Sequence, residues 1–159
     1  MKLARTGIIA AAILAVSSVA FAQKPDFSGT WTPDAPAAAP GAGGGGGGRG
    51  MGGGPMTVKQ DATTLTIEQT RGENKIVTSY KLDGTETVNK QAGRGGAEVE
   101  VKATAKWDGN KLVLSTSRPG QDGTPMVQSQ TWSLEGGNLV VERAGREGNA
   151  VKTTYKKTT

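Results

Sequence analysis

The sequence of 159 residues contains neither cysteine nor histidine. Without cysteine, the chain can form no disulfide bond and offers no thiolate to a metal ion. Without histidine, it cannot build a Ser-His-Asp or Cys-His catalytic centre or a histidine-ligated metal site. We therefore predict a protein that is held together by its hydrophobic core and hydrogen bonds, with no metal site and no cofactor.

Long hydrophobic runs are also scarce, and the longest is the nine-residue run Ile8–Val16. A span of the bilayer needs about 20 apolar residues, so this run is too short. It follows Lys2 and Arg5 and precedes the small-residue sequence Ala20-Phe21-Ala22, which is the pattern of a secretory signal peptide. We expect residues 1–22 to be removed and the protein to be exported to the periplasm or the extracellular medium, with no transmembrane segment.

The charge of the remaining chain is small. Loss of Lys2 and Arg5 leaves 17 basic and 14 acidic residues, a net charge of +3. The basic residues are spread over many segments and do not alternate with aromatic residues, which make up only 4% of the sequence. Binding to nucleic acid usually requires a basic patch with aromatic stacking platforms, so we predict no nucleic-acid partner.

Glycine and proline are concentrated in residues 33–55, which hold four prolines, and Gly41–Gly54 has 11 glycines among 14 residues. Such a segment buries too little apolar surface to offset its ordering entropy. We therefore interpret it as a flexible insertion within a single domain that covers residues 23–159. Its role is open between a low-complexity insertion without function and a mobile lid or surface-adhesion loop.

From Met56 onward, short runs rich in Val, Ile, Thr and Tyr alternate with turn residues, and no helical period is sustained. Asp-Gly and Gly-Gly-Asn sequences separate several of these runs and suit tight hairpins. We expect ten strands, near residues 27–32, 56–60, 63–70, 74–82, 85–90, 97–107, 111–117, 125–134, 138–144 and 149–157. This pattern predicts an all-β protein, and the short sequential connections favour an antiparallel up-and-down barrel over a sandwich.

Paired carboxylates can indicate hydrolase chemistry. Glu98 and Glu100 lie on one face of the expected strand 97–107, at a spacing that suits two catalytic acids. Lys102 and Lys106 share that face, however, and such a mixture is typical of the solvated exterior of a barrel. We therefore predict that the protein is not an enzyme.

Several short motifs resemble the calycin barrels, which include lipocalins, avidins and fatty-acid-binding proteins. They are Gly29-Thr30-Trp31 on the first strand, the turn Trp107-Asp108-Gly109, and Thr154-Tyr155-Lys156-Lys157 at the end of the last strand. With ten strands, the chain resembles the fatty-acid-binding group most. The opening Pro25-Asp26-Phe27-Ser28-Gly29-Thr30-Trp31 is also similar to that of small secreted bacterial proteins of unsettled function. The resemblance implies a calycin-like barrel whose lumen holds a small hydrophobic or amphipathic molecule.

The chain departs from fatty-acid-binding proteins at two places. Those proteins carry a helix pair between the first two strands, where this chain has residues 33–55. They hold the ligand carboxylate with an Arg on strand eight and an Arg-x-Tyr on strand ten. Trp132 and Thr153 occupy the places of the two arginines here, and Tyr155 is retained. We therefore expect carboxylates to bind no better than neutral analogues.

The candidate ligand-binding residues are Tyr80, Trp132, Tyr155 and Arg143. Trp132 shares a strand face with two glutamines, which suits either a partly polar lumen or a packed barrel. The two tyrosines offer either ligand contacts or ordinary buried phenols with backbone partners. Arg143 shares a face with Leu139 and Val141 and is either a lumen cation or a solvated strand end. Trp31 and Trp107 are predicted to be structural.

The combined interpretation is an exported, non-enzymatic barrel that binds a small molecule in its lumen. The alternative is an envelope or extracellular interaction protein, or a structural protein, with a packed interior and no small ligand. A lumen larger than roughly 300 Å³ favours binding, whereas an interior filled by side chains favours the alternative.

Overall fold

The structure, a computed structural model, describes residues 24–34, 54–71, 74–93, 97–120, 122–144 and 150–158. The predicted signal peptide 1–22 and residues 35–53 of the predicted insertion lie outside these residues. The strands are β1 (Gly29–Pro33), β2 (Met56–Gln60), β3 (Thr64–Arg71), β4 (Asn74–Lys81), β5 (Thr87–Ala92), β6 (Glu98–Asp108), β7 (Lys111–Pro119), β8 (Pro125–Glu135), β9 (Asn138–Ala144) and β10 (Ala150–Thr158).

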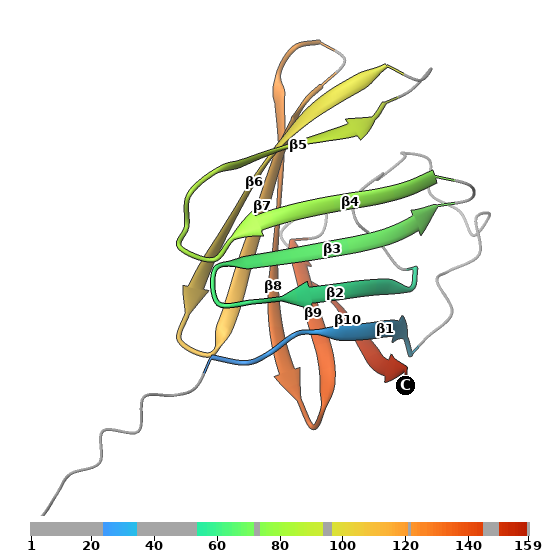
Figure 1. Cartoon of the computed structure of the whole chain (residues 1–159), viewed down its shortest axis with the longest axis vertical. Coiled ribbons are helices and arrows are strands. Elements are labelled where there is room, and N and C mark those ends of the chain that lie inside the picture. Colours follow the sequence, from blue (N-terminus) through green and yellow to red (C-terminus); the bar gives the residue numbers. More distant parts are fainter. Residues whose placement is uncertain are drawn as a thin grey trace, which may run out of the picture.

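The ten strands form one antiparallel sheet in the order β4-β3-β2-β1-β10-β9-β8-β7-β6-β5. The first strand pairs with the last, with Trp31 opposite Lys157, and every other ladder joins strands that follow each other in the chain. The sheet curls until β4 and β5 lie beside each other (Figure 1). This arrangement confirms the predicted ten-stranded antiparallel up-and-down barrel.

Side chains, rather than a backbone ladder, join β4 to β5, and we call this junction the seam. The Asn89 side chain accepts a hydrogen bond from the Ser79 backbone N–H (2.8 Å) and donates one to the Ser79 carbonyl (3.0 Å). Its amide thus takes the place of a peptide group of a neighbouring strand. Further along the seam, Gln91 Nε2 donates to Thr78 Oγ1 (2.8 Å). The barrel is therefore nearly closed, with two side-chain bridges across its break.

The turns and the alternation of faces follow the sequence pattern closely. On β6, Ala103 and Ala105 are fully buried, whereas Lys102 and Lys106 are exposed. Gly109 has a φ of 61°, in the left-handed region that a tight hairpin needs and that glycine adopts without steric cost.

The turn between β2 and β3 has no glycine and is held by a carboxylate instead. Asp61 Oδ1 accepts hydrogen bonds from the backbone N–H groups of Thr63 and Thr64, both at 2.8 Å. These bonds stabilise the ionised carboxylate and lower the pKa of Asp61 below its usual value.

Residues 24–28 cross one end of the barrel, and we call them the N-terminal plug. Phe27 is fully buried there, stacked against Trp107 with ring centroids 6.1 Å apart and edge-on to Trp132 at 5.7 Å. Gln60 ties the plug to β2, because its side chain accepts from the Phe27 N–H (3.0 Å) and donates to the Pro25 carbonyl (3.1 Å). These bonds explain why β1 begins at Gly29 rather than at Phe27 as predicted: the plug is bonded to a side chain and not to a ladder.

The plugged end of the barrel, which we call the closed end, also carries the turns that follow β2, β4, β6 and β8. The core begins there and extends along the barrel. Its buried members are Phe27, Trp31, Met56, Val58, Leu65, Ile67, Tyr80, Leu82, Ala103, Ala105, Leu112, Leu114, Trp132, Leu139, Val141 and Tyr155.

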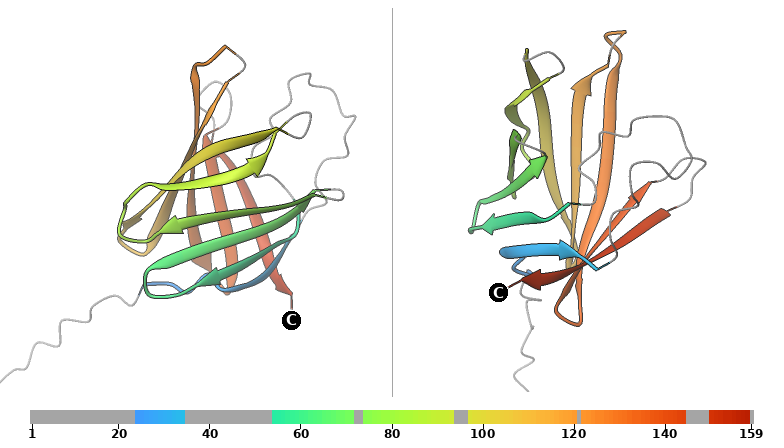
Figure 2. Two further views of the ribbon diagram at one scale, coloured as in Figure 1. Left: turned by 45° about the horizontal axis from the view of Figure 1, so that its top comes forward. Right: turned by 90° about the vertical axis from the view of Figure 1, so that its right-hand side faces the viewer.

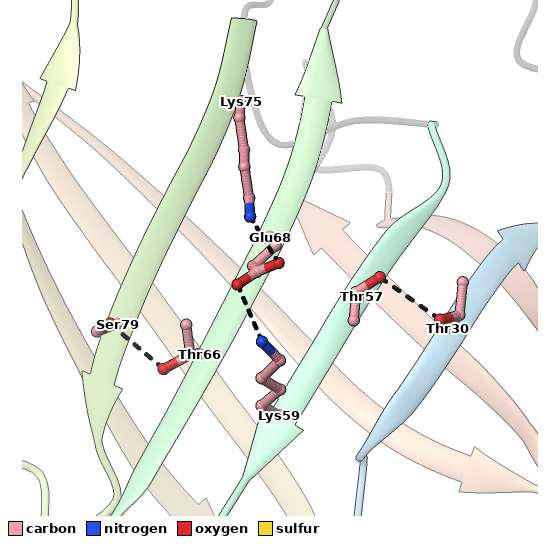
Figure 3. A network of polar contacts seen from close by, with 7 residues as sticks. All are labelled: Thr30, Thr57, Lys59, Thr66, Glu68, Lys75 and Ser79. Carbon is pink, nitrogen blue, oxygen red and sulfur yellow. Dashed lines mark hydrogen bonds and ion pairs between the residues drawn. The ribbon is translucent and has the colours of Figure 1, made fainter.

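The outer face is polar and is laced by short cross-strand contacts. Glu68 on β3 forms ion pairs with Lys59 on β2 (3.2 Å) and Lys75 on β4 (3.0 Å), as Figure 3 shows. Hydroxyl pairs such as Thr66–Ser79 (3.4 Å) lie on the same face. These contacts are typical of a solvated protein surface. A binding site is therefore expected on the inner face of the barrel.

Candidate functional site

The site lies on the inner face in the half of the barrel opposite the plug, which we call the open end. Residues that stand opposite each other in an antiparallel pair share a face of the sheet. Gln130 on β8 is opposite Arg143 on β9, and Met56 on β2 is opposite Gln69 on β3. All four line one narrow space inside the barrel, together with Trp132 and Val141.

We call Gln69, Gln130 and Arg143 the polar floor. The two glutamines are buried, each with 8% of its surface exposed, and Arg143 is half-buried. Arg143 Nε donates to Gln130 Oε1 at 3.3 Å, and Gln69 Nε2 approaches the sulfur of Met56 at 3.9 Å. Of the two interpretations that the sequence left open for Arg143, the structure supports the interior cation.

Trp132 lies next to the polar floor on the side of the plug. It is 1% exposed, and its indole N–H has no hydrogen-bond partner among the described residues. The space between Trp132 and the polar floor is too narrow to admit a water molecule. A buried donor without a partner costs free energy, about 1–3 kcal/mol, which an incoming acceptor would recover.

Apolar side chains lie beyond the polar floor, toward the open end. Val151 is opposite Arg143 and is 53% exposed, and Met126 on β8 is 48% exposed on the same inner face. Figure 2 shows that the β5–β6 and β7–β8 hairpins reach past the other strands at this end. A molecule that approaches the polar floor from solvent therefore passes exposed apolar side chains first.

The charges of the open half have one sign. Among the described residues whose register places them at inner positions there, Arg71, Arg118 and Arg143 are charged and none is acidic. The acidic side chains of these strands, such as Glu68, Glu100 and Glu142, occupy the alternate, outer positions. The inner surface therefore presents a positive potential within low-dielectric walls.

The two predicted tyrosines lie in the packed core. Tyr80 and Tyr155 are both fully buried. Burial raises the pKa of the Tyr80 phenol well above its ordinary value, so this group stays neutral. The Tyr155 hydroxyl has no hydrogen-bond partner in the described part of the chain, and the same holds for Thr87 Oγ1 and the indole N–H of Trp107. Their assignment as ligand contacts stays a prediction.

The other two tryptophans lie at the closed end. Trp31 is 1% exposed and donates its indole N–H to the Phe27 carbonyl (2.8 Å). Trp107 stacks on Phe27 and carries the Lys24 ammonium over its ring at 5.2 Å. Both therefore contact the N-terminal plug, where a structural role is the simplest explanation.

Sequence reasoning missed Arg118 and Gln69. The alternation of Leu112, Leu114 and Thr116 predicts the inner face of β7, but the strand was expected to end at residue 117. It continues to Pro119, and its next inner position is Arg118. Extending the same alternation by one step would have found this residue.

A separate cleft of about 340 Å³ lies at the closed end, outside the lumen. Its walls are the N-terminal plug and two turns, and its lining residues are Lys24, Gln60, Asp61, Ala62, Thr63, Leu82, Asp83 and Trp107. Hydrogen bonds from Thr85 lower the pKa of Asp83, so this carboxylate, like Asp61, is ionised at neutral pH. The cleft has the size of a ligand site, but it lacks the arginines and buried amides of the lumen.

Comparison with known proteins places the fold. No protein-family model matches the sequence, and no curated protein matches it significantly. Among solved structures, human cRBP IV is similar, with a TM-score of 0.53 and 19% identity over 84% of this chain and 99% of that chain. This likeness supports the fold alone, the ten-stranded antiparallel barrel.

Two further solved structures are similar at lower scores. The REP1-NXSQ fatty acid transporter has a TM-score of 0.47 and 16% identity, over 66% of this chain and 70% of that chain. A variant of the fluorescent protein UnaG has a TM-score of 0.47 and 21% identity, over 66% of this chain and 71% of that chain.

The described residues contain no cluster of three or more Asp or Glu side chains that could hold a metal ion. The same ranges contain no helix long and apolar enough to cross a bilayer.

Proposed function

We propose that the protein binds a small amphipathic molecule at the open end of its barrel. The acceptor group of the ligand would lie on the polar floor, against Arg143, and its apolar part would lie along Met126 and Val151. The observation that carries this proposal is the inward-facing, half-buried Arg143, which lines one space with Trp132. In the described part of the barrel, the Trp132 N–H has no partner and no acidic side chain occupies an inner position of the open half.

The guanidinium group of Arg143 has donors left for a ligand. It has five N–H donors, and one of them makes a hydrogen bond to Gln130, at a rather long 3.3 Å. A hydrogen bond from a charged donor contributes about 1.5–3 kcal/mol, which exceeds the contribution of a neutral one. An anionic or strongly accepting head group would therefore bind better than a neutral one. This reverses the expectation from the sequence, which found no cation at the positions used by fatty-acid-binding proteins.

The apolar part of the ligand would gain from burial at the exposed rim. Burial of apolar surface contributes about 25 cal/mol per Å². Because the space around Trp132 does not admit water, Trp132 must shift for the acceptor group of the ligand to reach its indole N–H, while the apolar part of the ligand lies above the polar floor. A short or slender molecule suits this site better than a bulky one.

We further propose that the protein is exported and acts as a binding protein rather than an enzyme. The signal-peptide pattern of residues 1–22 supports export. The similarity of the fold to human cRBP IV and the absence of histidine and cysteine from the sequence support a binding role.

The test is a binding screen with matched ligands. Dodecanoate and dodecanol differ in the head group alone, so titration of both by tryptophan fluorescence measures the contribution of charge. We expect dodecanoate to bind about tenfold tighter or more, and Arg143→Gln to remove that difference. A matched control is Lys111→Gln, which removes an equal charge from the exposed first residue of β7.

The alternative function is an interaction or structural role with a packed interior. The close packing around Trp132 favours it. Native mass spectrometry of the folded protein with lipids, sterols and aromatic metabolites decides between the two. If none of these compounds binds, the interaction or structural role is favoured and the proposal is overturned.

A further inference from the structure

A second polar space lies inside the open half of the barrel, next to the seam between β4 and β5. It is a cavity of about 40 Å³ that is lined by Thr78, Gln91, Val101, Thr116, Arg118, Met126 and Gln128. A water molecule needs about 10–15 Å³ on the same scale, so the cavity has room for a few waters or one compact ion. Five of its seven lining side chains are polar, which is unsuited to a hydrocarbon chain.

Arg118 is the charged group of this cavity and has no counter-ion in the part of the chain that the structure describes. It is half-buried, and no carboxylate of the described residues lies within ion-pair distance of it. Nor does its guanidinium make a hydrogen bond to any described residue. A partly buried cation usually has a partner, because desolvation raises the free energy of an isolated charge. The partner that fits this position is an anion from solution.

The walls of the cavity are suited to an anion. The Thr116 hydroxyl, on the same strand β7 as Arg118, and the side-chain amide of Gln128, on the neighbouring strand β8, are potential donors. Gln91 is fixed by its hydrogen bond to Thr78 across the seam, which sets one wall in place. The exposed side chains of Gln128 and Met126 lie at the solvent side of the cavity, so an ion can reach it from the open end.

We infer that this cavity is a binding site for a compact oxyanion, such as phosphate or a carboxylate, held by the guanidinium of Arg118. The planar guanidinium group binds such anions through two parallel hydrogen bonds. The site is distinct from the polar floor, because Arg118 lies on β7 and Arg143 on β9, on opposite sides of β8. It does not depend on the function proposed above.

The first experiment titrates the full mature protein with inorganic phosphate at constant ionic strength, with NMR detection of the arginine Nε–H resonances. We expect the Arg118 resonance to shift with saturation and the Arg143 resonance to stay in place. Arg118→Gln should weaken phosphate binding about tenfold or more, whereas Lys111→Gln, with the same change of charge, should leave it unchanged. The sequence contains no histidine, so no side chain titrates near pH 7 alongside phosphate.

A second variant keeps the test decisive if Arg118→Gln does not fold. Gln128→Glu places a carboxylate beside Arg118 at an exposed position with little change of shape. We expect it to fold normally and to lose phosphate binding, since the new side chain supplies the missing counter-ion.

Dodecyl phosphate distinguishes a free anion from the head group of a larger molecule. If it binds at least tenfold tighter than inorganic phosphate and still requires Arg118, the site holds a head group; equal affinity identifies a free oxyanion. The inference is overturned if neither probe binds, or if binding is equally strong in Arg118→Gln or Gln128→Glu. Failure of the dodecanoate test with success here would reject the proposed function alone.

Discussion

Replacement of Phe27 by alanine tests whether the N-terminal plug is an integral part of the barrel. Phe27 is fully buried and contacts both Trp107 and Trp132, while its carbonyl accepts the indole N–H of Trp31. Alanine keeps the backbone N–H and carbonyl that make these hydrogen bonds, so the change removes mainly the aromatic ring. Substitution of a buried Phe by Ala typically costs 3–5 kcal/mol through lost burial and the cavity left behind.

The expected shift in melting temperature follows from the size of the domain. For a chain of this length, 1 kcal/mol corresponds to about 3–5 °C, so Phe27→Ala should melt roughly 10–20 °C lower. Tryptophan fluorescence is a suitable probe, because the three tryptophans of the sequence all contact the plug residue. Urea unfolding at 25 °C gives the free energy directly.

The control is Val127→Ala, at a side chain that is 65% exposed on β8. Such a surface substitution should change the unfolding free energy by no more than about 0.5 kcal/mol. If Phe27→Ala costs less than about 1 kcal/mol, the plug is peripheral and the closed end is held by other contacts.

Three further predictions concern the seam, the turns and the lumen. Asn89→Ala should speed hydrogen exchange of the Ser79 amide, measured by NMR, because it removes the acceptor that protects this N–H; unchanged exchange would contradict the bridging role. The pKa of Asp61 is lowered in the folded state, so its stabilising contribution is present above about pH 4 and is lost as the pH falls through the folded pKa. Urea unfolding between pH 5 and pH 2 should therefore show a shallower loss of stability in Asp61→Asn than in the wild type. Trp132→Ala should weaken dodecanoate binding by about 1–3 kcal/mol, as titration by calorimetry would show, and equal affinity would remove Trp132 from the site.

Much of the fold follows from the sequence, because strand alternation and turn chemistry are local signals. The expected strand 97–107 and the observed β6, 98–108, differ by one residue at each end. Departures of two residues occur at β1, β5 and β7, and at β1 a tertiary contact decides the boundary. The plug residues were expected to be strand because they are adjacent to Trp31, but the Gln60 side chain, 33 residues away from Phe27, takes the bonds that a ladder would use.

The site was less accessible to sequence reasoning. The alternation along strand eight correctly placed Trp132 with Gln128 and Gln130 on one face. The alternation does not tell which of these side chains have hydrogen-bond partners in the folded barrel. Their surroundings include strands distant in the sequence, such as β3 with Gln69. The two positions at which fatty-acid-binding proteins carry an arginine hold Trp132 and Thr153 here, whereas the arginines that line the two inner spaces lie on β7 and β9.

The indole N–H resonances of the three tryptophans test the central claim most directly. Trp31 has its N–H bonded to Phe27, Trp107 lies at the closed-end cleft, and Trp132 lies beside the polar floor. The N–H groups of Trp107 and Trp132 both lack a hydrogen-bond partner among the described residues, so the position of each ring, and not its bonding, distinguishes the two. In a titration of the protein with dodecanoate, we predict that the Trp132 resonance moves with saturation while those of Trp31 and Trp107 remain in place. Movement of Trp107 with Trp132 unchanged would locate the ligand in the closed-end cleft and contradict the proposed site at the open end of the barrel.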